Sequence, residues 1–535
     1  MSSDDLLHES TNPYAASRAA NEAAADSSRG DGLSDDRSVS NECGPRDVMK
    51  LALPLIASTA SMTVMNFVDR MYLMWHSPVE FAAAMPAGIL HFALLCFPLG
   101  LASYVNTFVA QYHGAKQPGR IGVAVWQGMR IGFYCTPIFL LAVPLAPYLF
   151  QLAGHESDVA AAETIYFQVL ALSSGAAVIG AAMTAFYTGR GKTGTVMIVD
   201  VVANALNIVL DYAMIFGYWG FPELGIAGAA WATTISQWGK VGIYWYLMRA
   251  PEHRRTYQLD AGRRFDAALM RRLLKFGSPN GLQMFVEMGA VTLFVFLIGH
   301  LGTDAMTATN LAFNVNSVAF LPMMGMGLAV STIVGQQLGR NRADLAAKAT
   351  WTAMWLTAIY VGVLAVMYVA TPDLFLFAHA LGTSAEDFEA LRDTTIVLLR
   401  FVAVFCLFDM AQIMFASAIK GAGDTRFILW TTIIIAPLPV IAGWVGIRFF
   451  GGGLLWCWVV ITLWIAAAAV IYGVRFWHGK WRTMRVIEPD LLTDDEDLAS
   501  ASELAIETAA ENGGGGVLLD DSADSDEPLA DPAVA

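Results

Sequence analysis

Hydrophobic residues occur along most of the chain in long runs that short polar segments separate. With a window of about 20 residues, the length of a helix that crosses a bilayer, twelve such runs lie between residues 48 and 477. They span 48–74, 87–112, 121–149, 162–187, 194–217, 225–248, 276–299, 306–336, 345–371, 392–418, 427–449 and 453–477. The pattern predicts an all-α polytopic membrane protein with twelve transmembrane helices.

Composition agrees with this pattern once the ends of the chain are considered separately. Of 535 residues, 56% are hydrophobic and 15% charged, against about 25% charged in soluble proteins. The net charge of −14 comes from the ends: residues 1–45 hold nine acidic and three basic residues, and residues 486–535 hold fifteen acidic and no basic ones. The core is therefore basic, at +7. Because both ends lack apolar content, we expect residues 1–45 and 481–535 to be disordered acidic tails.

Basic residues cluster in every second loop. They follow runs two, four, six, eight, ten and twelve, and the link at 249–275 is the richest. Its bases are Arg249, Arg254, Arg255, Arg263, Arg264, Arg271, Arg272 and Lys275. Basic loops of membrane proteins remain in the cytoplasm, so both termini and this link are predicted to be cytoplasmic.

The two halves of the core repeat one another. Residues in the first half recur 225 positions later: Pro54 with Pro279, Gly100 with Gly325, Val109-Ala110-Gln111 with Val334-Gly335-Gln336, Gly114 with Gly339, and Gly228-x-x-Trp231 with Gly453-x-x-Trp456. Two segments beginning at Gly189 and Gly421 match at an offset of 232 and are expected to be tight cytoplasmic turns. Since six is an even number of spans, the repeat is parallel. It predicts an N-lobe at 46–248, the basic link at 249–275 and a C-lobe at 276–480.

Acidic residues inside the predicted spans are the strongest functional signal. A charged group at mid-bilayer costs roughly 2.5–3.5 kcal/mol even on a lenient scale. Five acids stand out: Asp69, Asp200, Asp211, Glu287 and Asp409. Asp69 is followed by Arg70, so a local ion pair near the span end is the alternative for this acid. Lys240 and Arg400 are the candidate buried cations, whereas Glu163 lies near a span end and is expected to be solvated.

Four polar residues of the fifth span form one stripe. Asn204, Asn207 and Asp211 follow Asp200 at offsets of four, seven and eleven positions, which places all four on one helix face. Their oxygens suit a hard cation such as Na⁺, and a desolvated carboxylate can bind a proton. An interhelical hydrogen-bond stripe without a transported ion is the alternative.

The acids are not duplicated with the rest of the repeat. Asp69 corresponds to Phe294, and Glu287 corresponds to Met62. Two different sites on a duplicated scaffold suit a coupled carrier better than a symmetric pore.

The core from about residue 46 to 480 resembles the multidrug and toxic compound extrusion (MATE) family, NorM-like, within the multidrug/oligosaccharidyl-lipid/polysaccharide flippase superfamily. The motifs that carry the resemblance are Leu53-Pro54, Phe67-Val68-Asp69, Val109-Ala110-Gln111 with Gly114, Asn207-x-x-x-Asp211, Gly225-x-x-Gly228-Ala229-Ala230, Val334-Gly335-Gln336-x-x-Gly339 and Gly421-x-Gly423-Asp424-Thr425. The resemblance implies a V-shaped pair of six-helix lobes that exports organic cations or other amphiphiles in exchange for Na⁺ or H⁺.

The same resemblance implies two ion or proton sites. In the N-lobe it selects Asp69, Asn207 and Asp211 as a possible Na⁺ site, with Thr233 or Thr234 as a further contributor. In the C-lobe it selects Glu287 and Asp409. Asp200 departs from the family pattern. Asn204 is a candidate for the N-lobe site only because it lies on the same helix face as Asp200, Asn207 and Asp211.

We therefore expect an efflux antiporter that works by alternating access. A flippase for lipids or lipid-linked saccharides is the alternative, although it would favour a basic cavity over these acids. A channel is a weaker candidate, and the spans show no spacing of nucleophile, base and metal that would indicate an enzyme. We expect a monomer in a prokaryotic plasma membrane, with membrane lipid and a small amphiphilic or cationic substrate as partners, no nucleic acid, and no cofactor beyond the coupling ion.

Overall fold

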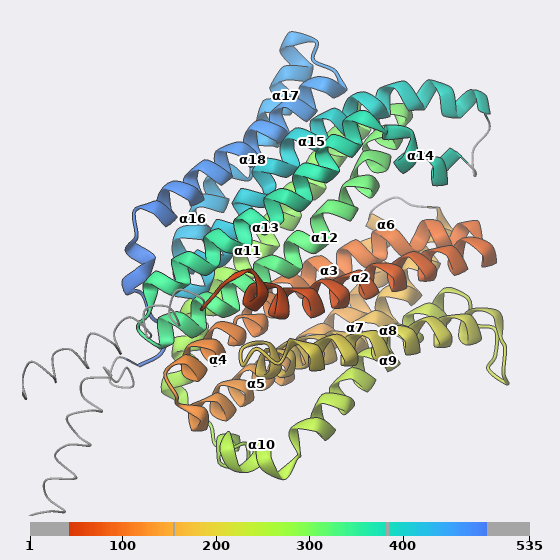
Figure 1. The fold of residues 1–535 in the computed structure, drawn as a ribbon. Coiled ribbons are helices and arrows are strands. Elements are labelled where there is room, and N and C mark those ends of the chain that lie inside the picture. Colours follow the sequence, from red (N-terminus) through yellow and green to blue (C-terminus); the bar gives the residue numbers. More distant parts are fainter. Residues whose placement is uncertain (1–41, 153–155, 381–384, 489–535) are drawn as a thin grey trace, which may run out of the picture. The chain divides into compact units, whose positions relative to one another are not determined.

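Helices make up every regular element of the described chain, as the hydrophobic pattern predicts (Figure 1). The computed structural model describes residues 42–152, 156–380 and 385–488. Most of the two predicted tails lies outside these ranges, so their disorder stays a prediction. The described residues belong to one compact unit.

Six spans form the first bundle, which is coloured red to olive in Figure 1. Proline opens α2, α3 and α5 at a position where its missing N–H costs no helical hydrogen bond. The second and third spans are each built from two helices in tandem. The elements are α2 (Pro45–His76), α3 (Pro78–Ser103), α4 (Val105–Gly114), α5 (Pro118–Ala142), α6 (Ala146–Leu152), α7 (Ser157–Thr188), α8 (Thr193–Phe216) and α9 (Ile226–Met248).

A short link leads to the second bundle, coloured green to blue. The link contains α10 (Pro251–Thr256) and the 3₁₀ turn η2 (Ala261–Arg263). The bundle contains α11 (Ala267–Gly299), α12 (Thr303–Gly339), α13 (Ala343–Ala370), α14 (Pro372–Ala380), α15 (Ala385–Ala422), α16 (Thr425–Ile435), α17 (Leu438–Phe450) and α18 (Leu454–Trp477), followed by η3 (Lys480–Thr483).

Each of the twelve predicted spans coincides with a helix or a tandem pair. Within the described chain, eleven of these segments are long and apolar enough to cross a membrane. The remaining span is α9, a 23-residue helix that packs against α7 and α8. Its sequence contains Thr233, Thr234, Ser236 and Lys240, which lower its mean hydropathy.

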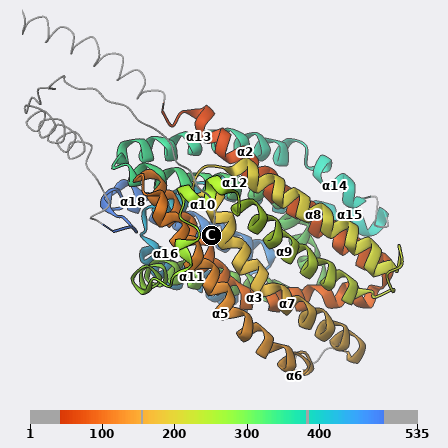
Figure 2. The ribbon, with the colours of Figure 1, turned by 90° about the horizontal axis from the view of Figure 1, so that it is seen from below.

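The two bundles meet through the half of the helices that carries the basic loops, called here the basic end. Helices α2 and α4 pack on α12, and α3 packs on α11, which can be followed in Figure 2. Glycines permit backbone contact there: a Cβ at Gly114 would clash with the Gln336 carbonyl, and one at Gly339 would clash with the Gln111 carbonyl. The two contacts are related by the repeat of 225 residues. We call this contact region the seam.

Two repeat-related glutamines cross the seam in opposite directions. Gln111 Nε2 donates to the Gly421 carbonyl at 3.0 Å, and Gln336 Nε2 donates to the Gly189 carbonyl at 2.8 Å. The acceptors lie in the two segments expected to be tight turns. Gly191 and Gly423 give these turns positive φ angles of 76° and 111°, so the tight turns are confirmed, and their cytoplasmic side stays a prediction.

The chain after η3 returns across the seam as a strap, residues 484–488. Val486 N donates to Gln111 Oε1 at 2.8 Å, while the Val486 carbonyl accepts from Arg272 Nε at 3.1 Å. Val486 and Ile487 are buried. The strap therefore contacts both bundles. It lies within residues 481–535, the segment that the sequence predicts to be a disordered acidic tail.

Candidate functional site

Two carboxylates lie close together inside the first bundle. Asp211 of α8 is fully buried and Asp69 of α2 is partly buried. They interact electrostatically with each other and with Tyr166 of α7. In the described part of the chain, the Oδ1 atom of each carboxylate is buried without a hydrogen-bond partner. Arg70 lies within electrostatic range of Asp69, but these two oxygens lack the hydrogen bonds that buried carboxylates normally have.

Asn207 positions the Asp211 carboxylate from one helical turn away. With its amide assigned so that both ends are satisfied, its nitrogen donates to Asp211 Oδ2 at 3.2 Å and its oxygen accepts from the Thr233 backbone N–H at 3.1 Å. Thr234 is buried and donates instead to the Val169 carbonyl at 3.1 Å. Of the two threonines, Thr233 is thus the one that lies beside the predicted site.

The other two members of the α8 stripe have different partners. Asp200 Oδ1 lies 2.6 Å from Lys240 Nζ of α9, and Asp200 Oδ2 accepts from the Ser58 hydroxyl. Asn204 Nδ2 donates to Ser61 Oγ of α2 at 2.8 Å. Along the stripe, Asp200 therefore has a counter-charge and Asn204 a hydroxyl partner, whereas Asp211 has only the Asn207 amide on one oxygen.

A second acidic group lies inside the other bundle. Glu287 of α11 interacts electrostatically with Asp409 of α15, which is 8% exposed. Glu287 Oε1 accepts from Gln283 Nε2 at 2.7 Å, and Lys420 also lies within its electrostatic range. Gln412, three residues after Asp409, has a buried Oε1 without a partner among the described residues.

Sequence reasoning missed several residues around these acids. Gln283 lies one turn before Glu287, so its spacing was a usable signal. Tyr166 and Ser58 come from other helices and have no such signal. Glu163 was expected to be solvated near a span end, but it is fully buried in α7, so that expectation was wrong. The helix extends six residues beyond it to Ser157.

The donor sets fit a small hard cation or protons. Two like-charged carboxylates in a desolvated site repel one another, and a cation or a shared proton relieves the repulsion. Oxygen ligands of this kind suit alkali and alkaline-earth cations. In residues 42–152, 156–380 and 385–488, no three His, Cys, Asp or Glu side chains group as a metal site. Each bundle instead offers two carboxylates and neighbouring neutral oxygens.

Two repeated six-helix bundles, with acids enclosed in each, define a polytopic membrane carrier. The sequence pattern of the MatE family matches residues 54–213 and 279–445, and the chain belongs to this family. The resemblance stated from the motifs is confirmed. The family consists of transporters.

Individual relatives cover nearly the whole core. A Thermotoga maritima protein described as probable multidrug resistance protein NorM is 25% identical over 450 residues, which are 83% of this chain and 94% of the relative. The Vibrio cholerae multidrug resistance protein NorM is 25% identical over 453 residues, covering 81% and 95%. These bacterial relatives agree with a multi-pass protein of the prokaryotic inner membrane.

A solved structure shares the fold. The outward-facing conformation of a MATE family multidrug resistance transporter superposes with a TM-score of 0.74 at 18% identity. The match covers 82% of this chain and 97% of that one. The predicted arrangement of two related helical lobes is thereby confirmed.

Proposed function

We propose that this chain is a secondary active exporter of organic cations or other amphiphiles, driven by the entry of Na⁺ or H⁺. Membership in the MatE family and relatives described as multidrug resistance proteins support the efflux role. The identity of the coupling ion and of the cargo belongs to the proposal. A monomer remains the predicted assembly.

The observation that carries this proposal is the Asp69–Asp211 pair. Each carboxylate keeps one buried oxygen without a partner, although Tyr166 of α7 and Asn207 of α8 lie nearby. A purely structural pair would be expected to satisfy these oxygens. The arrangement instead suits a site that takes up a cation or proton in one conformation and releases it in the other.

Alternating access follows from where the bundles touch. The seam closes the basic end through Gln111, Gln336 and the strap. Opening that end requires these hydrogen bonds to break. Ion and substrate need only bind the two orientations with different affinities to drive the exchange.

Transport in proteoliposomes tests the proposal. The purified full chain is reconstituted, and movement of a fluorescent organic cation is followed under imposed Na⁺ or pH gradients. We expect gradient-driven transport by the native protein. Asp211→Asn and Glu287→Gln should each reduce it to the level of empty vesicles, because each removes the charge that binds the ion.

Asp304→Asn is the matched control. Asp304 is an exposed acid in the first turn of α12, so the same change of charge should leave transport intact. Ion coupling would be contradicted if transport did not depend on either the Na⁺ or the pH gradient. Full activity of both Asp211→Asn and Glu287→Gln would also contradict it.

The flippase alternative is not favoured by the acids in either bundle, since an anionic lipid-linked cargo would require basic partners. The same vesicles discriminate the two functions. Movement of a labelled lipid headgroup to the opposite leaflet, without transport of the soluble cation, would support the flippase.

A further inference from the structure

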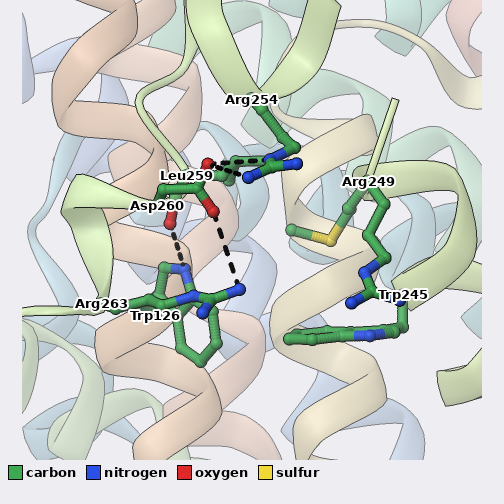
Figure 3. A pocket seen from close by; sticks show the side chains of 8 residues that line it. Trp126, Trp245, Arg249, Arg254, Leu259, Asp260 and Arg263 are labelled. Atoms are coloured by element: carbon green, nitrogen blue, oxygen red, sulfur yellow. Dashed lines mark hydrogen bonds and ion pairs between the residues drawn. The ribbon is translucent and has the colours of Figure 1, made fainter. Parts of the chain in front are cut away.

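A basic and aromatic pocket lies at the basic end of the first bundle, away from both acidic sites. It is an open hollow of about 440 Å³, open solvent included, between α5, α9 and the link (Figure 3). The residues that matter for its chemistry are Trp126, Trp245, Arg249, Arg254, Asp260 and Arg263. Neither the transport proposal nor the family motifs use this pocket.

The charge of the pocket is unbalanced. Asp260 engages two of the three arginines: Arg254 Nη2 lies 2.7 Å from its Oδ2, and Arg263 Nη2 lies 3.6 Å from its Oδ1. Arg249 has no ion pair among the described residues. Its guanidinium carbon lies 5.8 Å from the centre of the Trp245 ring. The pocket therefore has two more positive charges than negative ones.

The aromatic walls are fixed in place. Trp126 and Trp245 meet edge to face at 5.7 Å and 88°. Trp126 Nε1 donates to the Leu259 carbonyl at 2.8 Å, and Arg263 lies 5.6 Å from the Trp126 ring centre. Figure 3 shows Arg249 beside Trp245, without the dashed contacts that connect the other arginines to Asp260.

The position of the pocket along the helices indicates which kind of ligand it can bind. Trp245 lies three residues before the end of α9, at the level where a helix leaves the membrane. Tryptophan is enriched at membrane–water interfaces, and basic pockets beside transmembrane helices on the cytoplasmic side bind anionic headgroups. Arginine also matches the geometry of phosphate oxygens better than lysine does.

We propose that this pocket binds a phosphate diester or monoester, with Arg249 as the principal donor and Trp245 as its supporting wall. The anionic headgroup of a phospholipid and a soluble phosphate share this chemistry. The two tryptophans in the pocket lining favour the headgroup, because tryptophan is enriched at the membrane–water interface.

Native mass spectrometry of the full-length protein in detergent tests this proposal without any transport measurement. The protein is titrated separately with phosphatidylglycerol, phosphatidylcholine and inorganic phosphate. We expect retention of phosphatidylglycerol over phosphatidylcholine. Arg249→Gln should weaken that retention about fivefold, the effect of one basic residue near a membrane surface.

Arg255→Gln is the matched control, because Arg255 is an exposed arginine of α10 that does not line the pocket. The Arg255→Gln variant should retain as much phosphatidylglycerol as the native protein does. Phosphate binding that depends on Arg249, without a preference for phosphatidylglycerol, would support the anion site and assign it to a soluble phosphate. Equal losses in both variants, or no preference and no phosphate binding, would overturn the site.

Discussion

At the scale of single residues, Asp200 and Asp211 illustrate how one helix face can hold two different kinds of acid. Asp200 has Lys240 and Ser58 as partners, whereas Asp211 has an amide on one oxygen and no partner on the other. The first is compensated in the resting structure. The second keeps a buried oxygen without a partner, as the proposed ion or proton site requires.

Removing Lys240 should destabilise the protein. Lys240→Met leaves Asp200 without its counter-charge, and breaking a buried pair costs roughly 3 kcal/mol, less where water reaches the lysine. Thermal unfolding in detergent should show a lower Tm for Lys240→Met. The double variant Asp200→Asn with Lys240→Met should recover much of the loss.

The Asp200→Asn single variant completes this double-mutant cycle. If the two single changes simply add in the double variant, Asp200 and Lys240 are not coupled. Additivity would contradict the ion pair as the reason for an acid at position 200.

The sequence predicted where these residues lie on their helices but not how they pair. Asp200 and Lys240 were both identified as buried charges, yet they are 40 residues apart, and their contact depends on how α8 packs on α9. Periodicity gives the face of one helix only. The four acids selected by resemblance, Asp69, Asp211, Glu287 and Asp409, do lie in two groups, and their roles as ligands remain predictions.

At the scale of helices, the seam explains why certain glycines occur at the basic end. Gly114 and Gly339 each face a backbone carbonyl of the opposite bundle, at a distance that no Cβ could occupy. The repeat of 225 residues places both glycines and both glutamines in register. These motifs therefore maintain the contact between the bundles.

Gly114→Ala should open the seam. The added methyl group would clash with the Gln336 carbonyl, and because backbone cannot move aside locally, α4 and α12 must separate. Spin labels at Lys116 and Asp344, in a cysteine-free background, should report a longer distance than in the labelled native protein.

Gly88→Ala is the control for this experiment, since a Cβ at Gly88 meets no atom within 4 Å. It should leave the distance unchanged and gain up to about 1 kcal/mol of helix propensity. An unchanged distance in Gly114→Ala would contradict the close packing of the seam.

Helix positions were the most predictable level of structure. Long apolar runs define all twelve spans, since lipid requires continuous apolar surface. Local composition was less informative at the end of the core. The composition predicts an acidic tail from residue 481. However, Trp481, Val486 and Ile487 are buried, because a few apolar side chains suffice to dock a short segment.

At the scale of the whole molecule, the strap couples the two bundles through charge. Glu488 accepts from Tyr112 OH at 2.7 Å and from Arg120 Nη2 at 2.8 Å. Arg120 Nη1 also bonds Asp266 Oδ2 of the second bundle at 3.1 Å. Although burial opposes ionisation, hydrogen bonds from Tyr112 and Arg120 hold the pKa of the Glu488 carboxyl below its usual value.

The strap should therefore stay docked at neutral pH and detach only in acid. A carboxylate with a lowered pKa stabilises the folded contact above its unfolded value of about 4.3. That contribution disappears as the pH falls through the lower folded value. A spin label at Met484 should be immobile at neutral pH and gain mobility below about pH 4.

Glu488→Ala should give the mobile spectrum already at neutral pH, with helical content by circular dichroism unchanged. A label that stays immobile in this variant would show that Val486 and Ile487 dock the strap without Glu488.

The paired glutamines also have a meaning for how such a chain could arise. Each bundle supplies one glutamine donor and one turn carbonyl to the seam, so the bonds from Gln111 to Gly421 and from Gln336 to Gly189 are interchanged by an approximate two-fold axis. That is an isologous interface, the kind formed by two identical subunits. A six-helix ancestor carrying one such glutamine and one such turn would have held a second copy of itself by the same two bonds, before fusion joined them into one chain.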